Sequence, residues 1–171
     1  MQKTKKALLR TCICGMLMAL AFVFCRWLGF PTTGIWRVEM SFLPIAVIAM
    51  LYGPVWAGVS YGIADLIGAA IFTGVNPFIT MVKVAYGVVM GIFFYRKKKI
   101  GYKRILLATA IICVCLDFLA MATIFHFGFG YTWGAAFAAR AANATVNLAL
   151  RVPVLLLFDR RFTAILEEQR L

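Results

Sequence analysis

The position of the basic residues constrains this chain more than any other feature of its sequence. Long apolar stretches separate three groups of Lys and Arg: Lys3, Lys5, Lys6 and Arg10; Arg96, Lys97, Lys98, Lys99, Lys103 and Arg104; Arg160, Arg161 and Arg170. Apolar segments flanked by basic ones are typical of multi-pass membrane proteins, whose cytoplasmic loops carry an excess of positive charge. We therefore interpret the formal net charge of +12 as a sign of membrane topology, and we expect no nucleic-acid partner.

The composition agrees with a membrane protein that has no soluble domain. The chain is 64% hydrophobic and 14% charged, whereas soluble domains are about 45–50% apolar and about 25% charged. Because a bilayer crossing needs roughly 20 apolar residues, we expect one domain, 1–171, that folds as an all-α, compact bundle of six transmembrane helices. The predicted helices cover 7–28, 40–50, 55–72, 77–95, 105–125 and 135–158, and a short charged tail follows.

Six spans place both termini on the same side of the membrane. The three basic groups, which hold thirteen of the eighteen cations, are then cytoplasmic. Aromatic residues mark both membrane interfaces independently of charge: Trp27, Trp36, Tyr131 and Trp133 at the outer level; Tyr52, Trp56, Tyr95 and Tyr102 at the inner level. We expect a lipid-embedded, multi-pass protein of the cell membrane with both termini in the cytoplasm.

Two ionisable residues fall at membrane depth on neighbouring predicted helices. Asp65 and Lys83 both lie about 10 Å below the outer end of their shared hairpin, at the rise of an α-helix. Charges at this depth are costly unless they are paired or hydrated, so we expect the two side chains to be partners. Either the pair only fixes packing, or one member faces a ligand.

A polar stripe runs along the last predicted helix. Arg140, Asn143, Asn147 and Arg151 are spaced by three, four and four residues, so they share one helical face. Such a stripe faces other helices or a wet cavity rather than lipid. It either hydrogen-bonds to neighbouring helices or forms the polar wall of a binding site, most strongly at Arg140. We expect the deeper Arg151 to pair with Asp117 or to extend toward the inner surface.

Three pairs of small residues match the spacing at which membrane helices approach closely. They are Gly15 and Ala19, Gly58 and Gly62, and Gly87 and Gly91. We expect these pairs to pack the protein's own helices together. On the first helix, a surface for a partner protein is the alternative.

The sequence lacks the residues that nucleotide binding, metal binding or catalysis would need. The chain has no G-x-x-x-x-G-K-[ST] motif and only one histidine, His126. Cys12 and Cys14, like Cys113 and Cys115, are two residues apart and so point to different sides of a helix. We expect buried structural thiols, no metal, no cofactor and no catalytic residues, and hence a protein that is not an enzyme.

Three segments resemble a known family. They are Arg37-Val-Glu-Met-Ser-Phe-Leu-Pro-Ile-Ala, Met50-Leu-Tyr-Gly-Pro-Val-Trp-Ala-Gly and Gly62-Ile-Ala-Asp-Leu-Ile-Gly. Together with the length and six-helix layout, they resemble the substrate-binding (S) components of energy-coupling-factor vitamin transporters, and the folate group in particular. After Asp65 the chain departs from that group's Gly/Phe-rich stretch and reads Thr73-Gly-Val-Asn-Pro-Phe-Ile-Thr-Met-Val-Lys83.

The resemblance implies an importer subunit that captures a vitamin outside and releases it inside. Such a subunit joins a transmembrane coupling subunit and two ATPase subunits, which supply the energy. The small-residue motif on its first helix docks the coupling subunit, and this motif maps here to Gly15 and Ala19.

The residues themselves favour a flat aromatic anion such as folate. Arg binds carboxylates in a bidentate fashion, and aromatic faces stack on planar rings. The candidate ligand-binding residues are Trp36, Arg37, Asp65, Asn76, Lys83, Arg140 and Asn143. An S component for another vitamin or small metabolite is the alternative; a small membrane enzyme or an assembly factor is a third hypothesis.

Overall fold

The computed structural model describes residues 2–26, 30–31, 37–38, 40–72, 74–95 and 100–168. Its helices are α1 (Gln2–Arg26), α2 (Phe42–Tyr52), α3 (Pro54–Phe72), α4 (Pro77–Phe94), a continuous rod of α5 (Tyr102–Ile111), the π-helical η1 (Ile112–Ala120) and α6 (Met121–Phe129), and finally α7 (Trp133–Glu168). The predicted all-α fold with six helical rods is confirmed. A two-residue antiparallel pair, β1 (Phe30–Pro31) with β2 (Arg37–Val38), was not predicted.

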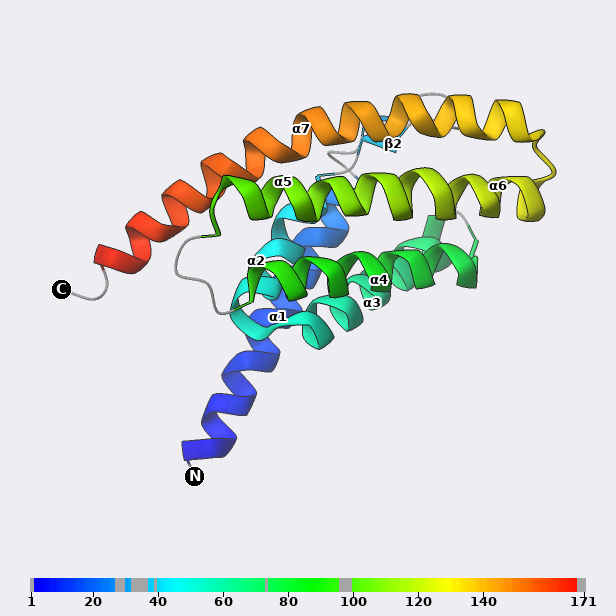
Figure 1. The fold of residues 1–171 in the computed structure, drawn as a ribbon. Helices are drawn as coiled ribbons and strands as arrows, with labels where there is room; N and C mark the ends of the chain where they lie inside the picture. The colour runs from blue at the N-terminus through cyan, green and yellow to red at the C-terminus, as the bar shows by residue number, and fades with distance from the viewer. Residues whose placement is uncertain are drawn as a thin grey trace.

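The helices form two layers. The α5–η1–α6 rod and α7 run side by side as an antiparallel hairpin, and this hairpin lies over α3 and α4 (Figure 1). Helix α1 crosses obliquely beneath and packs on α2 and α3. The N-terminus, the end of α4, the start of α5 and the C-terminal end of α7 all lie toward one end of the molecule. An even number of membrane crossings requires this arrangement, because both termini must then lie on the same side.

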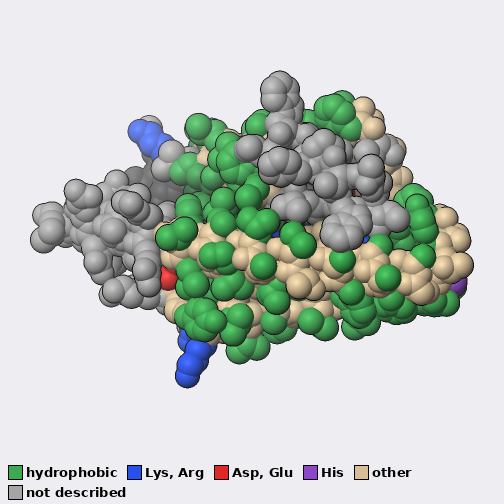
Figure 2. Space-filling model, turned by 90° about the horizontal axis from the view of Figure 1, so that it is seen from above, with side chains coloured by type: hydrophobic (Ala, Val, Ile, Leu, Met, Phe, Trp, Pro, Cys, Tyr) green, Lys and Arg blue, Asp and Glu red, His purple; other side chains and the backbone are tan. Residues whose placement is uncertain are grey.

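Four helical stretches are long and apolar enough to cross a bilayer: Pro54–Phe72, Pro77–Phe94, Tyr102–Phe129 and Trp133–Asp159. Two further apolar helices, Thr11–Cys25 and Phe42–Tyr52, are shorter. The 11 residues of α2 extend about 17 Å, less than the roughly 30 Å of a hydrocarbon core. Figure 2 shows mainly hydrophobic side chains over the described part of one face, with protruding Lys and Arg side chains toward one end and the histidine at the other. The exterior therefore suits a lipid environment.

Local sequence determines where the central helices begin. Gly53 adopts φ +92°, a left-handed conformation that glycine tolerates, and Pro54 then starts α3. The Asn76 side chain caps α4 by accepting a hydrogen bond from the Phe78 backbone N–H at 3.1 Å, with Pro77 in the first turn. Both helices begin within one residue of their predicted starts, 55 and 77.

The end of α7 was predicted wrongly. The helix continues to Glu168, whereas the sequence predicts its end at 158 and a short charged tail after it. Hydropathy falls there, but Leu, Glu, Ala and Arg are good helix formers, so the loss of apolar character does not end the helix.

Helices α3 and α4 lie so close together that their contact positions leave no room for a side chain and are occupied by glycine. A Cβ added to Gly58 would lie 2.8 Å from a Val88 methyl group, and one added to Gly62 would lie 2.6 Å from a Val84 methyl group. On α4, a Cβ on Gly87 would collide with the backbone of Ala57, and one on Gly91 with Pro54. The predicted internal packing role is therefore confirmed for these two glycine pairs, and they fix the register between α3 and α4.

Candidate ligand-binding site

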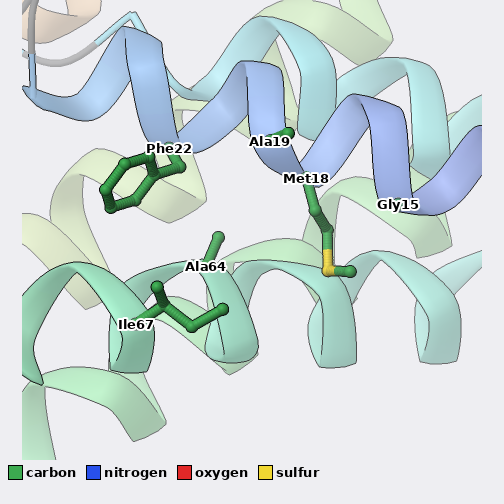
Figure 3. Close-up of a pocket in the computed structure, with 6 residues that line it drawn as sticks. All are labelled: Gly15, Met18, Ala19, Phe22, Ala64 and Ile67. Atoms are coloured by element: carbon green, nitrogen blue, oxygen red, sulfur yellow. The ribbon is translucent and has the colours of Figure 1, made fainter.

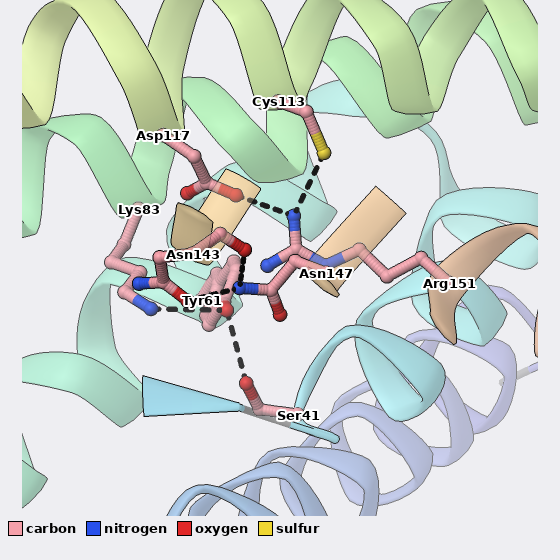
Figure 4. A network of polar contacts seen from close by, with 8 residues as sticks. All are labelled: Ser41, Tyr61, Lys83, Cys113, Asp117, Asn143, Asn147 and Arg151. Atoms are coloured by element: carbon pink, nitrogen blue, oxygen red, sulfur yellow. Dashed lines mark hydrogen bonds and ion pairs between the residues drawn. The ribbon is translucent and has the colours of Figure 1, made fainter. Parts of the chain in front are cut away.

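The polar residues of the bundle interior gather in one network, which we call the interior polar network (Figure 4). It joins the start of α2, α3, α4, η1 and α7. Its members drawn in Figure 4 are Ser41, Tyr61, Lys83, Cys113, Asp117, Asn143, Asn147 and Arg151. We also count Arg140 of α7 and Asp65 of α3 as members. These side chains come from segments far apart in the sequence, so the fold brings together groups that no local motif connects.

Helix α7 supplies one wall of the network, as its spacing predicts. Arg140, Asn143, Asn147 and Arg151 are exposed by only 9%, 6%, 3% and 4%. The Asn147 amide donates to the Asn143 side-chain oxygen at 2.7 Å and to its backbone oxygen at 3.0 Å. The prediction that this stripe faces the interior is confirmed, and the two asparagines stabilise each other's orientation.

The deep end of the network is an ion pair between α7 and the π-helical segment. Arg151 Nη1 lies 2.6 Å from Asp117 Oδ2 and 3.7 Å from the Cys113 sulfur. Its guanidinium carbon also lies 5.0 Å from the centre of the Tyr86 ring and 5.9 Å from that of Phe42. The predicted pairing of Arg151 with Asp117 is confirmed. Because Asp117 neutralises Arg151, this pair adds no net charge to the network.

Lys83 lies on the opposite wall, on α4, and is held by Tyr61 of α3. Its ammonium donates to the Tyr61 hydroxyl at 3.4 Å and lies 5.1 Å from the centre of the Tyr61 ring. The same hydroxyl lies 3.0 Å from the Ser41 hydroxyl. The Tyr61 ring packs edge-on against Tyr86, with centroids 5.3 Å apart. Lys83 is therefore oriented by a fixed aromatic side chain.

The predicted pairing of Asp65 with Lys83 is wrong. Asp65 accepts a hydrogen bond from Thr80 at 3.0 Å, and Lys83 donates to Tyr61. The physical reason is the antiparallel register that the α3–α4 glycines impose. This register sets Asp65 opposite Thr80, so Lys83 lies about one turn deeper, level with Tyr61.

Arg140 is the cation of the α7 stripe that lies nearer the start of the helix. Its guanidinium carbon lies 4.0 Å from the centre of the Phe125 ring, a cation–π contact with α6. Phe125 in turn packs on Phe129 and Tyr131, with centroids 5.1 and 5.8 Å apart. Beside it, Trp133 stacks on His126 with centroids 4.1 Å apart. One aromatic ring thus contacts Arg140, and further rings pack beside it, among them Tyr131 and Trp133, which the sequence predicts at this end of the bundle.

The remaining predicted residues have other positions. Trp36 lies outside the described residues, and for Arg37 only the backbone, in β2, is described. The Asn76 side chain is occupied as the cap of α4. Tyr61 and Ser41 belong to the interior polar network but were not among the predicted site residues. Two features of the sequence could have indicated them. Tyr61 lies one helical turn before Asp65, and Ser41 lies within the Arg37–Ala46 motif.

Away from the helix ends, the described membrane-spanning stretches contain the cations Lys83, Arg140 and Arg151 and the carboxylates Asp65 and Asp117. Ionisable groups at membrane depth often mark a ligand or ion pathway, so these residues mark a candidate binding site. No group of three or more His, Cys, Asp or Glu side chains capable of holding a metal occurs in the part of the chain that the structure describes. Cys14 and Cys113 are buried, whereas Cys12 and Cys115 are exposed, so the two members of each pair face different sides, as predicted. The expectation of buried thiols is therefore wrong for Cys12 and Cys115, because a residue two positions from a buried one lies on another side of the helix.

A second feature is an apolar groove between α1 and α3, with a volume of about 280 Å³. Its lining residues are Gly15, Met18, Ala19, Phe22, Ala64 and Ile67. Met18 and Phe22 point from α1 toward Ala64 and Ile67 of α3 (Figure 3). A Cβ added to Gly15 would meet no atom within 4 Å. Unlike the glycines of α3 and α4, Gly15 is therefore not required for close packing within the chain.

Comparison with protein families gives a match to the model described as "ECF transporter, substrate-specific component" over residues 10–159. The chain belongs to this family. The S component is thus a transporter subunit, in agreement with the expectation of a multi-pass membrane protein that is not an enzyme.

Two relatives of this S component are both named folate transporter FolT. The protein from Clostridium novyi is 37% identical over 112 residues, which cover 64% of this chain and 63% of the relative. The match therefore spans less than two thirds of that relative's length. The protein from Streptococcus mutans is 28% identical over 149 residues, covering 82% of this chain and 79% of the relative.

A solved structure shares the fold. It is a crystal structure of FolT bound with folic acid, with a TM-score of 0.81 and 24% sequence identity, covering 88% of this chain and 92% of that one. The six-rod architecture of this S component is therefore that of a known transporter subunit.

Proposed function

We propose that this S component binds folate, or a closely related pterin with an anionic tail, at the interior polar network. The observation that carries the proposal is the presence of two interior cations on different helices: Lys83 on α4, held by Tyr61, and Arg140 on α7, against the ring of Phe125. The folate-transporter names of two relatives support the choice of ligand.

The network offers each group that folate needs. The ammonium of Lys83 and the guanidinium of Arg140 suit carboxylates, which form strong charge-assisted hydrogen bonds. The aromatic rings around Arg140 provide faces for a planar pterin or aminobenzoyl ring. The amides of Asn143 and Asn147 offer both donors and acceptors to a heterocycle. Asp65 supplies an acceptor at the outer level.

Transport requires partners, which we infer from the family and from the α1–α3 groove. A transmembrane coupling subunit docks on α1 at Gly15 and Ala19, where small residues leave space for another helix. Two ATPase subunits attached to it hydrolyse ATP. In this arrangement the S component takes the ligand from outside, and its termini and basic segments face the cytoplasm.

Titration calorimetry with the purified protein tests the ligand. We expect folate to bind with a nanomolar dissociation constant, about −12 kcal/mol. Lys83→Met and Arg140→Ala should each weaken binding by about 30-fold, because each removes one partner of a buried charge pair at roughly 2–5 kcal/mol. Lys103→Met is the matched control, since Lys103 is exposed at the start of α5 and should bind as wild type. Tight binding of another vitamin, with none of folate, would retain the S component and refute the folate assignment.

A further inference from the structure

Tyr61 occupies the junction of three segments in the interior polar network (Figure 4). Its hydroxyl lies 3.0 Å from that of Ser41, just before α2, and accepts a hydrogen bond from Lys83 of α4 at 3.4 Å. Its ring packs edge-on against Tyr86, with an interplanar angle of 88°. Tyr61 and Ser41 are only 3% and 1% exposed. The tyrosine is thus fixed on several sides, whereas Lys83 is only half-buried.

We propose that Tyr61 is a positioning residue that holds the Lys83 ammonium in place for the anionic group of the ligand. This inference rests on the proposed function. A lysine side chain loses rotamer entropy when it is fixed, and Tyr61 fixes it before the ligand arrives. Binding then costs less, which is the advantage of a preorganised site.

A double-mutant cycle measured by folate titration tests this role. Tyr61→Phe should weaken folate binding by about tenfold, the effect of losing one hydrogen bond to a charged group. In a Lys83→Met background, the same substitution should have almost no further effect, because Tyr61 acts through the ammonium. Ser41→Ala, which removes the support of the Tyr61 hydroxyl, should act in the same direction, less strongly, and should also lose its effect in the Lys83→Met background.

Tyr86→Phe is the matched control. It removes a hydroxyl from the ring that touches Tyr61, and this hydroxyl is buried without a hydrogen-bond partner among the described residues. It should leave folate binding unchanged. Thermal unfolding in detergent verifies that each variant folds.

Equal weakening by Tyr61→Phe with and without Lys83 would overturn the positioning role, since a purely structural effect does not depend on the ammonium. Unchanged binding by Tyr61→Phe would overturn it as well. If the wild-type protein does not bind folate, the proposed ligand fails instead, and the same cycle with the vitamin that does bind then tests Tyr61.

Discussion

Replacing Gly15 by Leu separates a docking surface from internal packing. A Cβ at Gly15 meets nothing within 4 Å, and the residue borders the apolar α1–α3 groove. Glycine costs about 0.8–1 kcal/mol in a helix interior relative to alanine, and leucine is among the better helix formers. We therefore expect Gly15→Leu to leave the stability of the isolated protein unchanged or slightly raised, and to leave its ligand affinity intact.

Uptake should respond differently from binding. A leucine side chain fills space that a partner helix needs at a small-xxx-small surface. Cells that express the complete transporter with Gly15→Leu or Ala19→Leu should therefore lose vitamin uptake, and affinity purification should no longer recover the coupling subunit. Vitamin uptake, ligand titration and thermal unfolding of the same variants give the three readings.

Gly91→Leu is the matched control for internal packing. A side chain at Gly91 would collide with Pro54 of α3, and overpacking of this kind typically costs about 1–3 kcal/mol or more. It should lower the unfolding temperature and ligand affinity together. If Gly15→Leu also lowers both, the α1 pair packs the protein's own helices and the docking argument is refuted.

Two further predictions concern topology and the buried ion pair. Cysteines introduced at Gly74 and Gly130 should react with an impermeant thiol reagent from outside intact cells, whereas one at Lys103 should not; labelling of Lys103→Cys from outside would reverse the orientation. Asp117→Asn should destabilise the protein by about 3–5 kcal/mol, because it leaves the Arg151 charge buried without its counterion. In a thermal unfolding assay, the double variant Asp117→Leu with Arg151→Met should recover much of this lost stability. Equal destabilisation by the single and the double variant would show that the pair's charge is not what matters.

Features that depend on one helix at a time could be predicted from the sequence. The apolar stretches and basic groups predicted six helical rods, and helical periodicity placed Arg140 and Asn143 on a buried face. The partner of Arg151 also followed, because Asp117 is the one carboxylate predicted within the neighbouring helix. Each of these conclusions needs only the period and length of a helix.

Features that depend on the contact between helices could not be predicted from the sequence. Pairing Asp65 with Lys83 assumed that equal depth makes two residues neighbours. The close approach of Gly87 to Ala57 instead shifts the register by one turn, and no pattern within one helix contains that shift. The role of Tyr61 is hidden for the same reason, since its partners come from the start of α2 and from α4.

The small-residue pairs show the same limit. Gly15 with Ala19 has the same spacing as the glycine pairs of α3 and α4, so sequence alone leaves internal packing and partner docking open. The surroundings of each glycine distinguish the two roles. A Cβ at any of the four α3 and α4 glycines would meet a close neighbour from the same chain, whereas a Cβ at Gly15 would not.

The central claim is the identity of the ligand, and mass spectrometry of the molecule that co-purifies with the protein tests it most directly. Protein expressed in cells supplied with folate, purified without added ligand and then denatured, should release a folate or reduced folate in about equal amount to the chain. This ratio should fall in Lys83→Met and Arg140→Ala and remain unchanged in Lys103→Met. Release of a different vitamin in that amount, with no folate, would contradict the account.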